Sequence, residues 1–430
     1  MEQTGFDTRE TENRRRSVIN FCVLLVLFVI YALTFTIAKF YDMINIVYSC
    51  AGVVNFVMLT VLFFNNAVFP GKSHDGTEAV PTVGAGPVRI PDIRKEKGLE
   101  LYILAAVTVI AGVNLIIVDS GKGAFFVPVN FILIWYLSDK LYLSLCQLKA
   151  FAWIYAGFIV FYLFIAYPRL FTTFDNYKYN TNTAATFMIY TILCAFILLQ
   201  MMKEKSPVTG LFMVMILLKG FQLSLWHRAR GAFVMIILFM VFMYVIPKKL
   251  WGSRVFYTVM CVLATAGSLM FVGLYVLIGT TGANFKLPFF YKEVFSGREA
   301  IWKELFGLLT DPSKPYMLFT GIGTNFELTS FFEKNVHNAM YNFVVIHGIV
   351  VFAGILFFIF KRLLSFRMTV AKNAVAMCAM CALMAVFFES WFDVDLIWAD
   401  YALNLMFLLC VINSSGKGGP VPEKDEAKEL

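Results

Sequence analysis

The chain has 430 residues, of which 60% are hydrophobic and 15% are charged, and its formal net charge is +8. Soluble globular domains average about half apolar and about a quarter charged residues, so this composition excludes a soluble protein and indicates one that lies in lipid. The positive charge fits membrane topology and does not indicate a nucleic-acid-binding protein.

Five apolar runs are long enough to cross about 30 Å of hydrocarbon at about 1.5 Å per helical residue. They are residues 18–37, 46–64, 101–118, 255–278 and 342–360. Less clean candidates are residues 125–137, 148–166, 184–202, 208–225, 231–246, 373–388 and 402–411. We therefore predict an all-α integral membrane protein with about twelve transmembrane helices. The first run is too long for a cleaved signal peptide and is expected to stay as a span.

The basic residues predict the orientation. With the N-terminus in the cytoplasm, 23 of the 36 Lys and Arg residues fall at cytoplasmic ends, 12 fall outside, and Lys219 falls within a span. This excess follows the positive-inside rule and places both termini in the cytoplasm. Lys219 is costly if it faces lipid, so it either snorkels outward or lines a polar cavity.

Four regions are expected. Residues 1–278 hold the first nine spans, with a flexible Gly- and Pro-rich cytoplasmic loop at 70–98. Residues 279–341 form one long outer loop between the ninth and tenth spans. Residues 342–412 hold the last three spans, and residues 413–430 form a polar cytoplasmic tail.

Two arginines depart from the charge rule. Arg228 and Arg230 share a very short outer connection, which indicates a functional use. In the long loop, Ser296, Gly297, Arg298 and Glu299 open a segment with helical apolar spacing, and Ser296 with Glu299 resembles a capping box. A first-turn guanidinium at Arg298 suits phosphate, although it can equally pair with a loop carboxylate or with lipid headgroups.

His337 and Asn338 lie just before the tenth span. An imidazole can accept a proton from an attacking hydroxyl, and an amide can position sugar hydroxyls, although a single His at a helix end is often structural. His347 lies about 15 Å deeper on the same helix and is expected to pack. Gly321 to Gly323 reads as a tight turn.

Acidic residues cluster around the last outer connection, at Glu389, Asp393, Asp395 and Asp400. They can pair with the arginines, bind a sugar or form a solvated edge. Asp393 and Asp395 spell a DxD motif, but these short letters recur by chance, and a mechanism without metal or cofactor is favoured. Cys378 and Cys381 form a CxxC in an apolar stretch, where thiols act as small hydrophobes.

Together these motifs resemble the bacterial O-antigen ligase and polysaccharide polymerase superfamily. The resemblance rests on residues 229–232 (ARGA), 296–298 (SGR) with Ile301 and Trp302, 321–323 (GIG), and 337–338 (HN) leading into 348–349 (GI). It covers residues 222–356, and the N-terminal half matches only in being hydrophobic. Trp226 and His227 stand where the family more often has Ser or Thr before the arginine, which leaves the role of Arg228 open.

The resemblance implies a GT-C-like fold and a metal-independent, inverting glycosyl transfer from an undecaprenyl-diphosphate-linked glycan at the outer face of the bacterial cytoplasmic (inner) membrane. It implies that Arg230 and Arg298 bind the diphosphate, with Arg228 as a further candidate, and that His337 activates the acceptor hydroxyl. Asn338 and Lys219 are possible substrate ligands. Polymerisation of repeat units is slightly favoured over ligation to lipid A-core.

A secondary transporter or lipid-linked sugar flippase is the alternative of a different class, because such proteins also have about twelve spans. Transporters commonly place polar groups near mid-membrane on broken helices. The polar groups singled out here are expected at one face instead.

Overall fold

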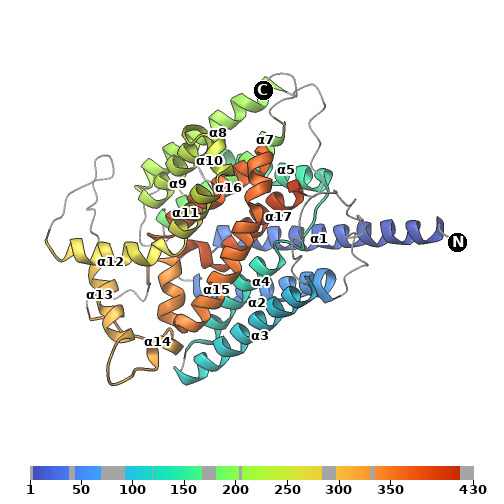
Figure 1. Ribbon diagram of the computed structural model, residues 1–430. Coiled ribbons are helices and arrows are strands. Elements are labelled where there is room, and N and C mark those ends of the chain that lie inside the picture. Colours follow the sequence, from blue (N-terminus) through green and yellow to red (C-terminus); the bar gives the residue numbers. More distant parts are fainter. Residues whose placement is uncertain are drawn as a thin grey trace.

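The computed structural model describes residues 3–37, 44–68, 93–118, 120–166, 181–202, 206–282, 297–329 and 335–416. Within these ranges the chain is helical and contains no strand, as predicted (Figure 1). The helices of the first half are α1 (Gln3–Ile37), α2 (Ile44–Phe63), α3 (Ile93–Ile117), α4 (Phe126–Leu137), α5 (Leu145–Phe161) and α7 (Thr181–Met202). The second half holds α8 (Pro207–Trp226), α9 (Arg230–Met240), α10 (Lys248–Gly252), α11 (Arg254–Ala264), α12 (Gly267–Gly279), α13 (Arg298–Leu309), α14 (Met317–Thr320), α15 (Ala339–Lys372), α16 (Ala374–Glu389) and α17 (Ala402–Gly416).

Single turns of 3-10 or π-helix extend several of these elements. They are η2 (Phe64–Val68), η3 (Lys122–Phe125), η4 (Tyr162–Ala166), η6 (Val241–Val245), η7 (Asp395–Ile397) and η8 (Ala399–Tyr401).

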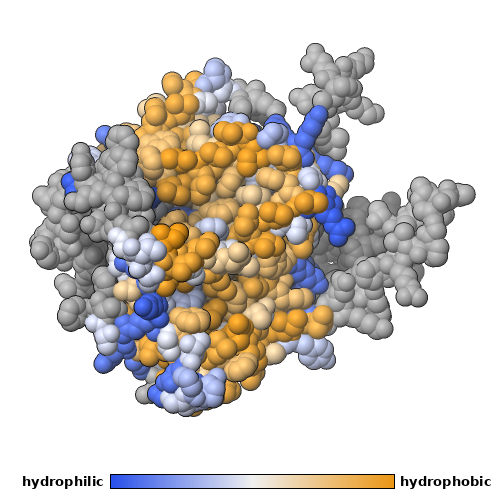
Figure 2. Space-filling view, turned by 60° about the vertical axis from the view of Figure 1, so that its left-hand side comes forward, coloured by the Kyte–Doolittle hydropathy of each residue, from blue (hydrophilic) through white to orange (hydrophobic). Residues whose placement is uncertain are grey.

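Six of the described helices are long and apolar enough to cross a membrane, and a seventh span forms if α11 and α12, which meet at a bend of 55°, are one. The other five expected spans coincide with apolar helices of 10–17 residues. The count of twelve is therefore not confirmed; by length and apolar composition, six or seven of the described helices are candidate membrane spans. Figure 2 shows a broad hydrophobic surface across the middle of one face, with hydrophilic residues gathered toward its edges.

Several region boundaries differ from the prediction. Helix α3 begins at Ile93, inside the loop expected at 70–98, and residues 69–92 lie outside the described part. Helix α17 continues to Gly416, so the tail expected from Asn413 begins later. Side-chain caps fix several starts: Asn373 accepts hydrogen bonds from Val375 and Ala376, a type of cap that contributes about 1 kcal/mol.

Helix α16 lies at the centre of the bundle and is buried along almost its whole length. It contacts α7, α9 and α17, and all three present buried apolar residues to it. This central helix determines the site, because its last residue, Glu389, and the connection that follows it emerge at one end of the bundle. We call this end the arginine end, because the first turn of α9 with Arg230 lies there too.

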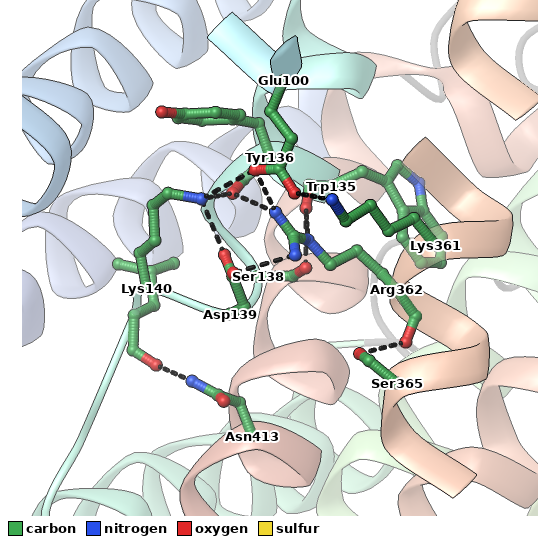
Figure 3. A network of polar contacts seen from close by, with 11 residues as sticks. Glu100, Trp135, Tyr136, Ser138, Asp139, Lys140, Lys361, Arg362, Ser365 and Asn413 are labelled. Atoms are coloured by element: carbon green, nitrogen blue, oxygen red, sulfur yellow. Dashed lines mark hydrogen bonds and ion pairs between the residues drawn. The ribbon is translucent and has the colours of Figure 1, made fainter. Parts of the chain in front are cut away.

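At the other end of the bundle, charged residues form the Glu100 cluster: Glu100, Asp139, Lys140, Lys361 and Arg362 (Figure 3). Arg362 binds Glu100 and Asp139 at 2.8 Å each. Its Nε also donates to the carbonyl of Trp135 in the last turn of α4. Lys140, Lys361 and Arg362 are among the 23 basic residues expected at cytoplasmic ends, and the structure pairs them with two carboxylates, Glu100 and Asp139.

Helix α15 is broken at Gly348, whose φ of 82° is accessible mainly to glycine. The backbone around Gly321 packs into this break. A Cβ on Gly348 would overlap the backbone of Phe319 and Gly321, and a Cβ on Gly321 would overlap the backbone of Ile346 and His347. Ile322 donates to the carbonyl of Val345, and the amide of Asn114 donates to the carbonyl of His347. These bonds satisfy the carbonyls that the break exposes, as buried backbone requires. Gly321 and Gly323 have φ values of 80° and 72°, but no hydrogen-bonded turn forms at the described residues 321–323, so the tight turn expected there is not confirmed.

Candidate diphosphate-binding site

A pocket of about 250 Å³ opens at the arginine end. Its charged lining residues are Arg228, Arg230, Arg298, Glu389 and Asp393. They come from the connection between α8 and α9, the first turns of α9 and α13, and the end of α16 with the connection that follows. Segments that are up to 165 positions apart in sequence, from Arg228 to Asp393, thus meet in one pocket.

The two arginines of the α8–α9 connection both line the pocket, as the departure from the charge rule suggested. Arg228 has a φ of 52°, in the left-handed region that non-glycine residues rarely adopt. Arg230 is the first residue of α9, and its N-cap Ala229 makes no side-chain capping bond. The first-turn N–H groups of α9 and the positive end of its dipole therefore add to the guanidinium charge at this wall.

Arg298 reaches the pocket as the first residue of α13. Gly297, with φ 87°, precedes it and is the N-cap, so the prediction of a Ser296 capping box is wrong; Ser296 itself lies outside the described residues. The expected apolar face is present, with Ile301, Trp302, Leu305 and Leu309 buried. Trp302 donates from Nε1 to the carbonyl of Val336 at 2.6 Å, which ties α13 to the segment that carries His337.

His337 is the second described non-glycine residue with a positive φ, again 52°. Strained backbone of this kind persists only where surrounding contacts hold it, and it gathers at functional sites. The backbone N–H of His337 bonds to Oδ1 of Asn335, and helix α15 begins two residues later. The imidazole Nδ1 lies 3.9 Å from Oδ1 of Asp393.

Asp393 connects the histidine with the arginines. Its Oδ2 lies 4.0 Å from a guanidinium nitrogen of Arg298, while its Oδ1 faces His337. Burial raises the pKa of the Asp393 carboxyl, but the nearby His337 imidazole and the Arg298 guanidinium lower it by more, so the pKa lies below its ordinary value. Asp393 is therefore a carboxylate that faces a guanidinium group on one side and an imidazole on the other.

Glu389 is the carboxylate whose position sequence reasoning did not single out from its acidic neighbours. Its side chain is 1% exposed and lines the pocket, and Oε2 has no hydrogen-bond partner among the described residues. A Cβ on Gly231 would lie 2.5 Å from Oε1 of Glu389. The carboxyl group therefore occupies the place beside the first turn of α9 where an anionic ligand would be favoured.

Asn338 and Lys219 do not join this group. The Asn338 amide is fully buried: Oδ1 accepts from Ser268 and from the N–H of Tyr341, and Nδ2 donates to the carbonyl of Trp391. We assign it the role of helix cap in place of the expected sugar contact. Lys219 bonds to Gln222 on the surface of α8 and is not among the residues that line this pocket.

The remaining sequence candidates are distributed differently. His347 is buried at the break of α15, as the packing interpretation required. Asp395 is buried and does not line the pocket that Asp393 lines. Within the described ranges, no three His, Cys, Asp or Glu side chains gather as a metal site. Cys378 and Cys381 are buried, free thiols of α16.

No protein-family model and no curated protein matches the chain. The pocket combines three guanidinium groups, a helix N-terminus and two carboxyl groups, one of which faces the imidazole of His337.

Proposed function

We propose that this protein is a membrane glycosyltransferase of the GT-C type. It moves a glycan from an undecaprenyl-diphosphate carrier onto a sugar hydroxyl at the outer face of the bacterial inner membrane, without a metal. The observation that supports the proposal is that Arg230 and Arg298 line one pocket together with Asp393, whose carboxyl group faces Arg298 on one side and His337 on the other.

The proposed reaction is a single displacement. The acceptor hydroxyl oxygen attacks the anomeric carbon, the bond from that carbon to the diphosphate oxygen breaks, and the carbon inverts. The hydroxyl proton moves to His337, whose Nδ1 faces Asp393, so that Nε2 is the nitrogen that accepts it. Asp393 stabilises the imidazolium that forms, as the carboxylate does in other sites where a histidine acts as the general base.

Charge develops on the diphosphate as it leaves, and stabilising this charge is the main task of the site. Arg230 and Arg298 supply planar forks that suit phosphate oxygens, and Arg228 lines the same wall. The first-turn N–H groups of α9 add donors whose positions are fixed before the substrate binds. Undecaprenyl diphosphate is the product that leaves.

Within this class we favour polymerisation of repeat units of a cell-surface polysaccharide over ligation to lipid A-core. The deciding experiment incubates the purified protein with a lipid-linked repeat unit, with and without a lipid A-core acceptor, and determines product masses. Longer glycans on the lipid carrier alone support a polymerase, and product only in the presence of lipid A-core supports a ligase. Absence of any glycan transfer by a folded sample, together with movement of the lipid-linked sugar across vesicles, would support a flippase instead.

His337→Ala and Arg298→Lys test the residues. We expect His337→Ala to abolish transfer, and Arg298→Lys to lower it about a hundredfold because the planar fork is lost. Lys219→Ala is the matched control, because this cation lies near the same end of α8 but outside the pocket. Wild-type transfer by His337→Ala would remove the proposed base, and equal loss in Lys219→Ala would show that the assay reports folding.

A further inference from the structure

A group of basic residues lies at the end of the bundle opposite the arginine end. Helix α9 begins at the arginine end and continues as η6 to Val245, so α10, which follows, lies at the opposite end. Helix α15 likewise begins just after His337 and ends at Lys372. We call the basic residues of these two segments the α10 patch: Lys248, Lys249, Arg254, Arg367 and Lys372.

The two segments that carry the α10 patch are in direct contact. A guanidinium nitrogen of Arg367, Nη1, donates to the carbonyl of Gly252 at 2.8 Å. A Cβ on Gly252 would lie 3.5 Å from Cβ of Ala371, the neighbour of Lys372. Trp251 in the same turn of α10 is fully buried, which holds this short helix against the bundle. The five basic residues therefore belong to one packed surface.

The positive charge of the α10 patch is not neutralised by the described protein. Four of its side chains are exposed, and that of Arg367 is partly buried. Residues 247–256 and 361–373 include no acidic residue, and no carboxylate of the described ranges forms an ion pair with any member of the patch. The Glu100 cluster differs, because its Lys361 and Arg362, on the same helix α15, pair with carboxylates (Figure 3).

The side chains beside the α10 patch indicate the class of its partner. Tyr244, Val245, Leu250 and Val255 are exposed apolar residues that lie before, between and after the basic residues of α10. A surface that combines exposed apolar groups with cations suits the boundary between hydrocarbon and headgroups. An anionic phospholipid matches both parts, because its phosphate group faces the cations while its acyl chains cover the apolar side chains.

We propose that the α10 patch binds the headgroup of an anionic phospholipid in the leaflet at this end of the bundle. Phosphatidylcholine fits less well, because its ammonium group offsets the phosphate charge and is repelled by the cations. The proposal does not depend on glycosyl transfer, since no member of the patch lines the diphosphate pocket.

Lipid binding to the purified full-length protein, measured by native mass spectrometry, tests the proposal. The protein in a non-ionic detergent is titrated with dioleoylphosphatidylglycerol and, separately, with dioleoylphosphatidylcholine. We expect wild type to bind the anionic lipid about tenfold more tightly. The triple variant Lys248→Gln, Lys249→Gln, Arg254→Gln should lose most of this preference, since each cation near a lipid surface contributes about fivefold in affinity.

A second triple variant, Lys122→Gln, Lys303→Gln, Lys314→Gln, is the control, because it removes the same charge from exposed lysines outside the patch. It should keep the preference, and unfolding temperatures show whether both variants are folded. Equal loss in the two variants would show an effect of net charge alone and would overturn the proposal. Retained preference in the patch variant, or no preference in folded wild type, would also overturn it.

Two further arms test other occupants of the patch. Excess glycerol 3-phosphate, which has the phosphate without acyl chains, should not displace the bound lipid, and complete displacement would show that the patch binds phosphate alone. Neutralising the acidic residues of the C-terminal tail should leave the preference unchanged; the substitutions are Glu423→Gln, Asp425→Asn, Glu426→Gln and Glu429→Gln. A preference that arises only in this variant would show that the tail covers the patch. Either result would overturn the proposal.

Discussion

Glu389 and Gly231 are in such close contact that a side chain on residue 231 would displace the carboxyl group of Glu389, since a Cβ there would lie 2.5 Å from its Oε1. This contact brings a buried carboxyl group against the first turn of α9, in a pocket with three arginines. The proposed diphosphate must share this space with Glu389, so a side chain on residue 231 is expected to affect donor binding.

Gly231→Ala should lower glycan transfer about tenfold or more, because the added methyl group pushes Glu389 into the pocket. The measurement is the initial rate of transfer from a lipid-linked donor, alongside the thermal unfolding temperature in detergent. Gly210→Ala in α8 is the control, because nothing lies within 4 Å of its Cβ position. Full activity in Gly231→Ala would show that the contact with Glu389 has no part in the site.

Glu389→Gln should leave donor binding nearly unchanged. Burial disfavours the charged form of the Glu389 carboxyl group, so the variant replaces a neutral acid with a neutral amide of nearly the same shape. We expect the KM for the donor to change by less than about twofold. A donor titration measures the KM, with Glu327→Gln, outside the pocket, as the control. A KM that falls severalfold would show that Glu389 carries a negative charge that repels the diphosphate.

His227 should make stability depend on pH between about 6.5 and 4. It is buried beside Arg228, and burial lowers the pKa of its imidazole from 6.5 to about 4. The unfolded chain then binds a proton in this window while the folded chain does not, so stability falls as pH falls through 6.5 and levels off near 4. The full effect is about 3 kcal/mol at about 1.4 kcal/mol per pH unit.

Unfolding temperatures across pH 4 to 8 measure this dependence in wild type and in His227→Gln. The variant has no group that titrates at this position, so its curve should be flatter over the window. Parallel curves for the two proteins would show that protonation of His227 does not couple to folding.

Arg362→Met should destabilise the protein more than Lys361→Met. Arg362 is buried and binds both Glu100 and Asp139, so its loss leaves a buried carboxylate without its closest partner, which costs about 3–5 kcal/mol. Lys361 is more exposed, and its pair with Glu100 contributes about 1 kcal/mol or less. Denaturation in a mixed detergent series compares the two variants. Similar losses in both would indicate that Glu100 is well solvated.

The helical class and the arginines of the pocket could be predicted from the sequence, because long apolar runs indicate spans and because Arg228 and Arg230 depart from the positive-inside rule. The sequence could not show that Asp393 and Glu389 line the pocket. Four acidic residues cluster near the last connection, and only the packing of α16 decides which of them reach the pocket. The role of Asn338 could not be predicted either, because an asparagine at this position suits a sugar ligand as well as a helix cap.

The break in α15 was also beyond prediction, because the apolar pattern continues through Gly348 without a change. The break lies where the backbone around Gly321 packs against Gly348, and this contact is not visible in the sequence of the helix itself. Likewise, Gly297 rather than Ser296 caps α13, because a left-handed residue directs the chain into the helix.

The broken α15 also bears on the thickness of the surrounding bilayer. Its 34 residues would reach about 50 Å as one straight rod, well beyond the roughly 30 Å of a hydrocarbon layer. A long apolar helix in a thinner layer normally tilts as a whole. Here the hydrogen bonds from Asn114 and Ile322 hold the first segment of α15, residues 339–347, against α3 and the chain at Gly321. We therefore expect the second segment, residues 349–372, to tilt in response to hydrophobic mismatch while the imidazole of His337 keeps its position.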